Sequence, residues 1–180
     1  MLILFGDKIR SQTKPFLYLF QLVGAKDPVH DVLFTKQSLS HMYAHAQRRL
    51  WQKEAGGEIF SSDPTSNGLI ISVATGPNPS DYRRRCAWNP DLSASDINRQ
   101  MEYAHNRHPV GLWHTHPEPT PSPSWRDQET TWEYLDSFQG DRSQYLLVII
   151  GNYGNVPNMA VWMARYQSTR KWMQLTEATK

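Results

Sequence analysis

The stretch GLWHTHPEPTPSPSWRDQ, residues 111–128, ends an apolar run with two histidines and continues into closely spaced prolines. An apolar run of this length predicts a buried strand, and Pro117 must end it because proline has no N–H to donate to the ladder. Residues i and i+2 of a strand point to the same side of the sheet, with Cα atoms about 6.6 Å apart. His114 and His116 can therefore reach one metal ion.

The residues after the prolines offer a third ligand. Asp127 falls in the first turn of a helix expected from Ser124 to Phe138, and the stiff proline connection would hold that turn near the strand end. Two imidazoles and a carboxylate suit zinc, which in hydrolytic sites has three protein ligands and one position for water. Two other interpretations stay open. The histidine pair can be a chance spacing, and Ser124 with Asp127 also has the spacing of an N-capping box, which needs no metal.

Strand and helix patterns alternate irregularly around this stretch. Strand patterns occur at 16–23, 31–34, 56–61, 69–75, 83–89, 110–116, 145–152, 159–166 and 169–175, and helix patterns at 37–49, about 93–104 and 124–138. Because the regular βαβ alternation of a doubly wound fold is missing, the sequence predicts an α+β fold, a central twisted mixed sheet flanked by helices. We expect residues 1–180 to form a single domain.

Turn and capping signals refine this expectation. The turn-rich DPTSNG, residues 63–68, predicts a hairpin between the strands on either side, and Ser93 with Asp96 predicts a capping box. Apolar side chains at helical spacing predict the buried faces of the three helices. These faces are Leu39, Met42, Ala46 and Leu50 in the first, Ile97, Met101 and Ala104 in the second, and Trp125, Trp132, Leu135 and Phe138 in the third.

The composition limits the classes of partner and compartment. A net charge of +2 argues against bulk nucleic-acid binding, although Arg83-Arg84-Arg85 is either a solvated face or a dock for an acidic partner. The single Cys86 excludes an intrachain disulfide and is expected to be a buried, inert thiol in a reduced compartment. Without a signal-peptide pattern or about 18 consecutive apolar residues, the chain is expected to be cytoplasmic and free of membrane.

The spacing His-x-His, seven residues, Ser, two residues, Asp resembles the zinc motif of the JAMM, or JAB/MPN, metalloproteases, and HTHPEPTPSPSWRD matches it at every fixed position. The similarity spans about residues 32–166, with residues 1–30 left as an extension of uncertain role. It is closest to the stand-alone bacterial JAB deconjugating proteases of CBASS-type antiphage operons, and it implies the MPN/JAB fold, which is cytidine-deaminase-like.

The resemblance also implies the roles of individual residues. His114, His116 and Asp127 would hold Zn²⁺, whose bound water has a pKa of about 7 and serves as the nucleophile. Glu54, ahead of Gly56-Gly57, would be the general acid and base, with Glu58 as a rival, and Ser124 would stabilise the oxyanion. The remaining histidines and three acids are expected to have no metal role. These are His30, His41, His45, His105, His108, Glu118, Glu129 and Asp136.

The implied activity is an isopeptidase or peptidase that cuts the amide bond after the C-terminal residue of a ubiquitin-like or CBASS-synthase (CD-NTase-type) conjugate. The substrate would be a protein with an extended C-terminal tail, added as a strand beside a sheet edge. We expect residues 75–85 and the proline loop to flank that groove. The alternatives are a non-catalytic MPN-type scaffold and a zinc hydrolase of a small-molecule amide.

Overall fold

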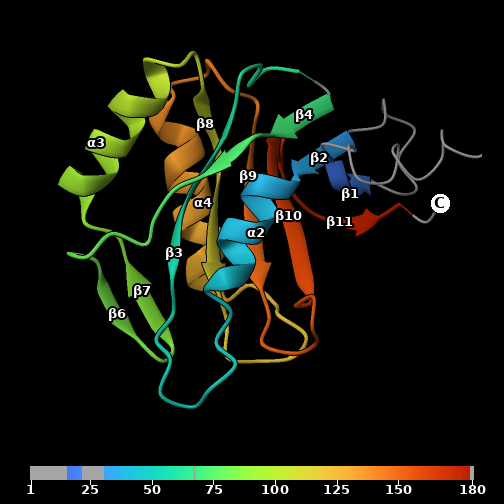
Figure 1. Cartoon of the computed structure of the whole chain (residues 1–180). Coiled ribbons are helices and arrows are strands. Elements are labelled where there is room, and N and C mark those ends of the chain that lie inside the picture. The colour runs from blue at the N-terminus through green and yellow to red at the C-terminus, as the bar shows by residue number, and fades with distance from the viewer. Residues whose placement is uncertain (1–15, 22–30, 67, 179–180) are drawn as a thin grey trace, which may run out of the picture.

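The computed structural model describes residues 16–21, 31–66 and 68–178, in which nine strands form one sheet (Figure 1). Their order is β4-β2-β1-β11-β10-β9-β8-β3-β5, and β6 pairs with β7 in a separate hairpin. The strands are β1 Phe16–Gln21, β2 Asp31–Thr35, β3 Gly56–Ser61, β4 Gly68–Ile71, β5 Val73–Ala74, β6 Tyr82–Arg84, β7 Ala87–Asn89, β8 His108–Thr115, β9 Gln144–Ile150, β10 Met159–Tyr166 and β11 Arg170–Glu177. The helices are α2 Lys36–Ala44, α3 Leu92–Tyr103 and α4 Trp125–Ser137.

Helices cover both faces of this sheet (Figure 1). In β9, Leu146, Val148 and Ile150 belong to the core that includes α2, whereas Leu147 and Ile149 belong to the core that includes α4. This alternation follows from the two-residue period of a strand that is buried on both sides. The pairs β8–β9 and β2–β4 are parallel and the other pairs antiparallel, so the predicted α+β fold with a mixed sheet is confirmed.

The strand predicted at 69–75 is two strands, and the predicted hairpin is wrong in its pairing. β4 adds to β2 in parallel, and only the two-residue β5 pairs with β3. The break lies at Ser72, whose N–H and hydroxyl both donate to Phe60 O. The local turn signal was therefore correct, but the edge of β2 offered β4 a four-residue ladder that no local signal could predict.

The strand predicted at 83–89 is instead the hairpin β6–β7, in which Arg84 pairs with Ala87. Its turn holds Arg85 and Cys86, and the Cys86 thiol is exposed rather than buried, so that expectation was wrong. A two-stranded hairpin has too little area of its own to bury such a side chain.

Helix α2 ends at Ala44, five residues before the predicted end. Leu39, Met42 and Ala46 are buried as predicted, but Leu50 lies beyond the helix and is 77% exposed. In α4, Leu135 is buried as predicted and Trp132 and Phe138 pack against its core, whereas Trp125 is 71% exposed.

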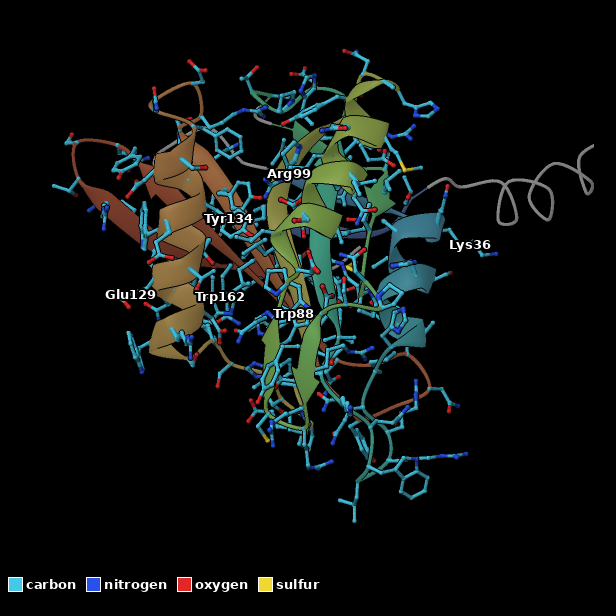
Figure 2. The ribbon with its side chains drawn as sticks, turned by 90° about the vertical axis from the view of Figure 1, so that its left-hand side faces the viewer. Lys36, Trp88, Arg99, Glu129, Tyr134 and Trp162 are labelled. Carbon is cyan, nitrogen blue, oxygen red and sulfur yellow. The ribbon has the colours of Figure 1, made fainter. Side chains whose placement is uncertain are left out.

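The predicted inward face of α3 is wrong. Ile97 and Met101 are exposed, and the N-cap is Asp91, which accepts from Ala94 N, rather than Ser93. The helix is held by a charged side chain, because the Arg99 guanidinium donates to the buried Glu58 carboxylate at 2.9–3.0 Å. Arg99 also lies over the ring of Tyr134 from α4, across the gap between the two helices (Figure 2). Apolar spacing alone could not reveal a helix that docks through an ion pair.

In the described part of the chain, no helix has the length and apolar character needed to cross a bilayer. The sequence predicts a strand at 16–23; β1 confirms it for Phe16–Gln21, and residues 22 and 23 lie outside the described residues.

Candidate metal centre

The end of strand β8 presents His114, and His116 directly after the strand, to the α4 face of the sheet. Trp113 belongs to the opposite core, with α2, and Leu112 to the core with α4, so His114 and His116 follow the side of Leu112. The backbone is fixed on both sides, because Thr115 N donates to Ala55 O at 2.8 Å and His116 N donates to Ile150 O at 2.9 Å. The strand end that carries the imidazoles is therefore rigidly placed.

Asp127 reaches the same point from the first turn of α4, whose N-cap is Ser124. Its Oδ2 accepts from Ser124 N and from Ser124 Oγ, each at 2.7 Å, and Ser124 Oγ accepts from Asp127 N at 3.2 Å. The capping box anticipated from the spacing is therefore present. It orients the carboxylate toward the histidines rather than excluding a metal role.

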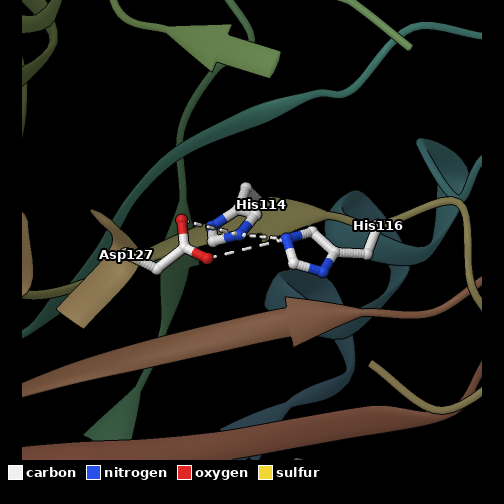
Figure 3. Close-up of side chains that lie close together, drawn as sticks. All are labelled: His114, His116 and Asp127. Carbon is white, nitrogen blue, oxygen red and sulfur yellow. Dashed lines mark hydrogen bonds and ion pairs between the residues drawn. The ribbon is translucent and has the colours of Figure 1, made fainter. Parts of the chain in front are cut away.

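The three side chains converge on one another (Figure 3). His114 Nε2 lies 2.9 Å from His116 Nε2 and 3.6 Å from Asp127 Oδ1, and His116 Nε2 lies 3.8 Å from Asp127 Oδ2. Four-coordinate zinc with bonds of about 2.0–2.1 Å separates its ligand atoms by roughly 3.3 Å. The separations bracket this value, and the donors are of the types zinc prefers, so the residues fit a metal ion.

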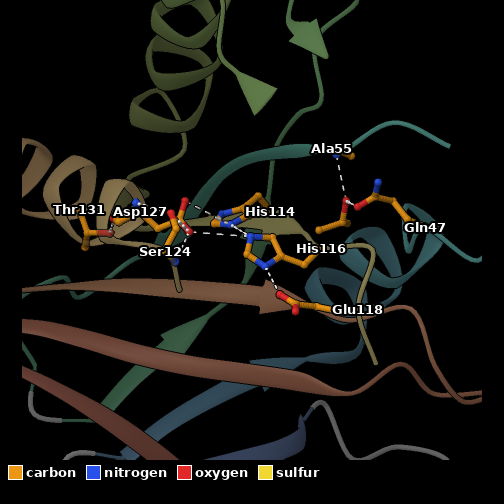
Figure 4. Close-up of polar contacts among 9 residues, drawn as sticks. Gln47, Ala55, His114, His116, Glu118, Ser124, Asp127 and Thr131 are labelled. Carbon is orange, nitrogen blue, oxygen red and sulfur yellow. Dashed lines mark hydrogen bonds and ion pairs between the residues drawn. The ribbon is translucent and has the colours of Figure 1, made fainter. Parts of the chain in front are cut away.

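Glu118 fixes the orientation of one imidazole and was missed as a functional residue. Its Oε1 lies 2.8 Å from His116 Nδ1 (Figure 4). A proton on Nδ1 that is donated to this carboxylate leaves the Nε2 lone pair free for a metal. The only sequence signal was a carboxylate two residues after His116, across Pro117, where no regular element predicts contact.

Burial keeps His114 neutral. Desolvation is the main cause that lowers its pKa to about 4; His116 lowers the pKa further, and Asp127 opposes the shift. A neutral imidazole has the lone pair that a metal ligand requires.

Glu54 lies at the same cleft, although its side chain comes from the loop before β3. Hairpin β6–β7 holds its backbone, because Glu54 N donates to Arg84 O at 2.7 Å and Arg83 Nε donates to Glu54 O at 2.5 Å. Burial is the main cause that raises the pKa of Glu54 to about 8, and the charges of Asp127 and Glu118 raise it further. A carboxyl group with its pKa near neutrality can both accept and return a proton.

These groups line a cleft of about 440 Å³ between hairpin β6–β7 and α4. Polar lining residues include Glu54, His114, His116, Glu118, Ser124 and Asp127. Its other wall includes Trp88, whose ring stacks toward His114 with a centroid separation of 6.5 Å. Glu58 does not line this cleft and is held by Arg99, so the geometry favours Glu54 over its rival.

A buried amide links the cleft to the loop before β3. Thr115, between the two histidines, donates through Oγ1 to Gln47 Oε1 at 3.1 Å and accepts from Ala55 N at 3.0 Å (Figure 4). Gln47 Nε2 donates to Arg85 O at 2.7 Å and to Gln52 O at 3.2 Å. Gln47 thus joins β8, the loop and hairpin β6–β7. No sequence pattern singled it out, because Thr115 and Arg85 lie far from it along the chain.

The other histidines lie elsewhere. The rings of His41 and His45 contact Trp113 on the opposite face of the sheet, His105 Nδ1 contacts Met101 O, and the ring of His108 contacts Tyr103. None of these four belongs to the metal cluster found in the described residues, and His30 lies outside them. Asp136 accepts from Arg170 and Tyr166, away from the cleft.

Comparisons with known proteins concern the family and the fold of the chain. A family model described as prokaryotic homologs of the JAB domain matches residues 35–165. A CD-NTase/cGAS isopeptidase of Pseudomonas aeruginosa (strain BWHPSA011 / Pa011) is 30% identical over 122 residues, which cover 66% of this chain and 75% of the relative. The solution structure of protein DSY2949 from Desulfitobacterium hafniense superposes with a TM-score of 0.56 at 16% identity and covers 78% of this chain and 88% of its own. That likeness concerns the fold alone.

Proposed function

The chain belongs to the prokaryotic JAB family, and we propose that it is a zinc-dependent isopeptidase that removes a protein conjugate by hydrolysing an amide bond. The observation that carries the proposal is the convergence of His114, His116 and Asp127 in a cleft that also holds the buried Glu54. Two imidazoles and one carboxylate suit zinc and leave one coordination position for the reaction. A bound zinc ion supplies the Lewis acidity that activates water at neutral pH.

Glu54 acts as the proton carrier of this reaction. Its carboxylate accepts a proton from the attacking water, whose oxygen forms a bond to the amide carbon. When the carbon–nitrogen bond breaks, the protonated Glu54 returns that proton to the departing amine, so the products are a carboxylic acid and an amine. A positioned acid–base group of this kind contributes about 10²–10⁴-fold to the rate.

Ser124 supplies a hydrogen bond to the oxyanion. Its hydroxyl donates to Asp127 Oδ2 in this structure, while Ser124 N donates to the same oxygen. If the lone pairs of Asp127 are given to zinc, the backbone N–H still orients the carboxylate and the hydroxyl hydrogen is free to turn toward the carbonyl oxygen. Ser124 would then cap α4 when its hydroxyl bonds to Asp127 and stabilise the oxyanion when its hydroxyl turns to the substrate.

The substrate is a protein whose extended C-terminal tail is joined to an amine. The relative from Pseudomonas aeruginosa is named for action on CD-NTase/cGAS conjugates, which supports a CD-NTase-type substrate and a place in CBASS-type antiphage defence. The tail lies along β7 as an added strand, since residues 86–90 line the cleft. Residues 75–85, which we expected to flank the groove, do not line the cleft. The wall of the proposed groove is instead strand β7 with the residues on either side of it.

The proposal is tested with a CD-NTase-type protein fused through its C-terminal residue to a reporter protein. The purified enzyme should cut the fusion after that residue, lose the activity to a chelator, and regain it with added zinc. Glu54→Gln should bind zinc and leave the fusion intact. Binding of the fusion without any cleavage by the zinc-loaded enzyme would indicate a scaffold. Cleavage of small amides alone would indicate a small-molecule hydrolase.

A further inference from the structure

A basic and partly apolar surface adjoins the cleft on its outer side. It consists of the loop after α2 and the turn of hairpin β6–β7, which lie together at the lower end of the sheet in Figure 1. We call it the basic rim. Its residues are Arg49, Leu50, Trp51, Lys53, Arg84 and Arg85.

The apolar part of the basic rim is unusually exposed. Leu50 is 77% exposed and its neighbour Trp51 is 74% exposed. The Arg49 guanidinium lies 5.4 Å from the centre of the Trp51 ring. Adjacent exposed leucine and tryptophan cost hydration free energy, and Trp together with Arg is the combination enriched where protein interfaces gain most of their affinity.

The charges of the basic rim are uncompensated. Residues 36–53 and 82–90 contain no aspartate or glutamate, and the adjacent Glu54 is buried in the cleft. Among the ion pairs of residues 31–66 and 68–178, none includes Arg49, Lys53, Arg84 or Arg85. Since the whole chain carries only +2, these four cations form a local positive field rather than a general one.

The basic rim is fixed to the catalytic cleft. Arg85 Nη1 donates to Leu50 O at 2.7 Å, and Gln47, bonded to Thr115 between the histidines, donates to Arg85 O. Cys86 and Ala87 line both the cleft and the shallow hollow of the basic rim, so the two surfaces are continuous. A partner seated on the basic rim is therefore held at a set position relative to Glu54.

From the charge, the exposed Leu50 and Trp51, and this continuity, we infer that the basic rim docks an acidic, partly apolar surface of the conjugated protein, next to the amide bond in the cleft. The inference rests on the proposed function and adds to it a determinant of the substrate. A protein surface fits better than a nucleic acid. Phosphates would pair with the cations, but they would leave the largely exposed Leu50 without an apolar partner.

The test compares the reporter fusion with a short tail peptide that ends in a fluorogenic amide. Arg49→Glu combined with Arg84→Glu should raise KM for the fusion about tenfold, leave kcat within twofold, and lower the fusion-to-peptide ratio of kcat/KM. Trp51→Ala should shift the same ratio in the same direction. Lys36→Glu combined with Lys171→Glu makes the same change in charge at exposed positions on α2 and β11 and should leave the ratio unchanged.

Binding keeps this inference separate from catalysis. The zinc-loaded Glu54→Gln protein should bind the fusion by fluorescence anisotropy, with an affinity that falls about tenfold when the two rim arginines are also reversed and that weakens with salt. If the enzyme cuts nothing, the proposed function fails while this binding difference still supports the dock. An unchanged ratio and unchanged fusion affinity would overturn the inference. The inference would also be overturned if Arg49→Glu combined with Arg84→Glu weakened the binding of a single-stranded oligonucleotide but not the binding of the fusion.

Discussion

Thr115 Oγ1 donates a hydrogen bond to Gln47 Oε1 at 3.1 Å, although 68 residues separate them along the chain. Thr115 is the residue between the two histidines, and its side chain points to the opposite face of β8. The same amide donates to Arg85 O in hairpin β6–β7 and to Gln52 O in the loop that precedes Glu54. One buried side chain thus connects the strand of the metal ligands with the segment of the proton carrier.

Replacing Gln47 by leucine should therefore destabilise the fold and slow the enzyme. The change keeps the volume but leaves two carbonyl groups and the Thr115 hydroxyl without their partner, which costs about 1–3 kcal/mol in the free energy of unfolding. Urea denaturation measures this cost. Gln37→Leu, at an exposed position of α2, is the control and should change stability by less than about 0.5 kcal/mol. Equal stability of the two variants would mean that the network contributes nothing.

The purified chain should bind one zinc ion, and Asp127→Ala should remove most of that binding. The carboxylate supplies the third ligand, and its loss leaves two imidazoles that cannot complete the site. Native mass spectrometry measures the metal content of each protein. Asp141→Ala removes an exposed carboxylate beyond α4 and should retain the ion. Full zinc occupancy in Asp127→Ala would contradict the assignment of this ligand.

Glu118→Gln should weaken zinc binding about 10–100-fold without removing a ligand. The substitution takes away the negative charge that accepts from His116 Nδ1, so the imidazole loses basicity and its fixed orientation. Competition with a chromophoric chelator gives the two dissociation constants. Glu129→Gln, on α4 outside the metal cluster, is the matched control (Figure 2) and should bind zinc like the parent chain. Equal constants for all three proteins would remove Glu118 from the site.

Glu54→Gln should change how the stability of the metal-free protein depends on pH. Burial raises the folded-state pKa of Glu54 to about 8, so folding favours the protonated group. Its contribution is fully present below the unfolded pKa of about 4.5 and is lost as pH rises toward about 8. Over that range, the free energy of unfolding should fall in the parent relative to Glu54→Gln. Parallel curves from denaturation at several pH values would show that the carboxylate is not buried.

The sequence was most informative where local pattern and chemistry coincide. Strand β8 is buried on both faces, and the capping box of α4 follows it closely in the sequence. The placement of His114, His116 and Asp127 could therefore be predicted from these two local patterns. The pairing of β4 depends on β2, far away along the chain. In the same way, α3 docks through Arg99 on Glu58, a contact between segments that share no pattern. The predictions for β4 and α3 were wrong because the partners of these elements lie far away along the chain.

Ser124 combines a structural and a proposed chemical role, and one pair of variants separates them. Ser124→Ala removes the cap of α4 and should cost about 1 kcal/mol of stability; it also removes the oxyanion donor, which should lower kcat about 10²–10³-fold. Thr35→Ala removes the cap of α2, a helix on the opposite face of the sheet from the cleft, and should cost a similar stability while kcat stays within twofold. Denaturation and kcat are measured for both variants on the reporter fusion. Because the two variants lose the same kind of cap, a fall in kcat confined to Ser124→Ala cannot come from helix fraying alone, and an equal kcat in both would leave Ser124 as an N-cap without a chemical role.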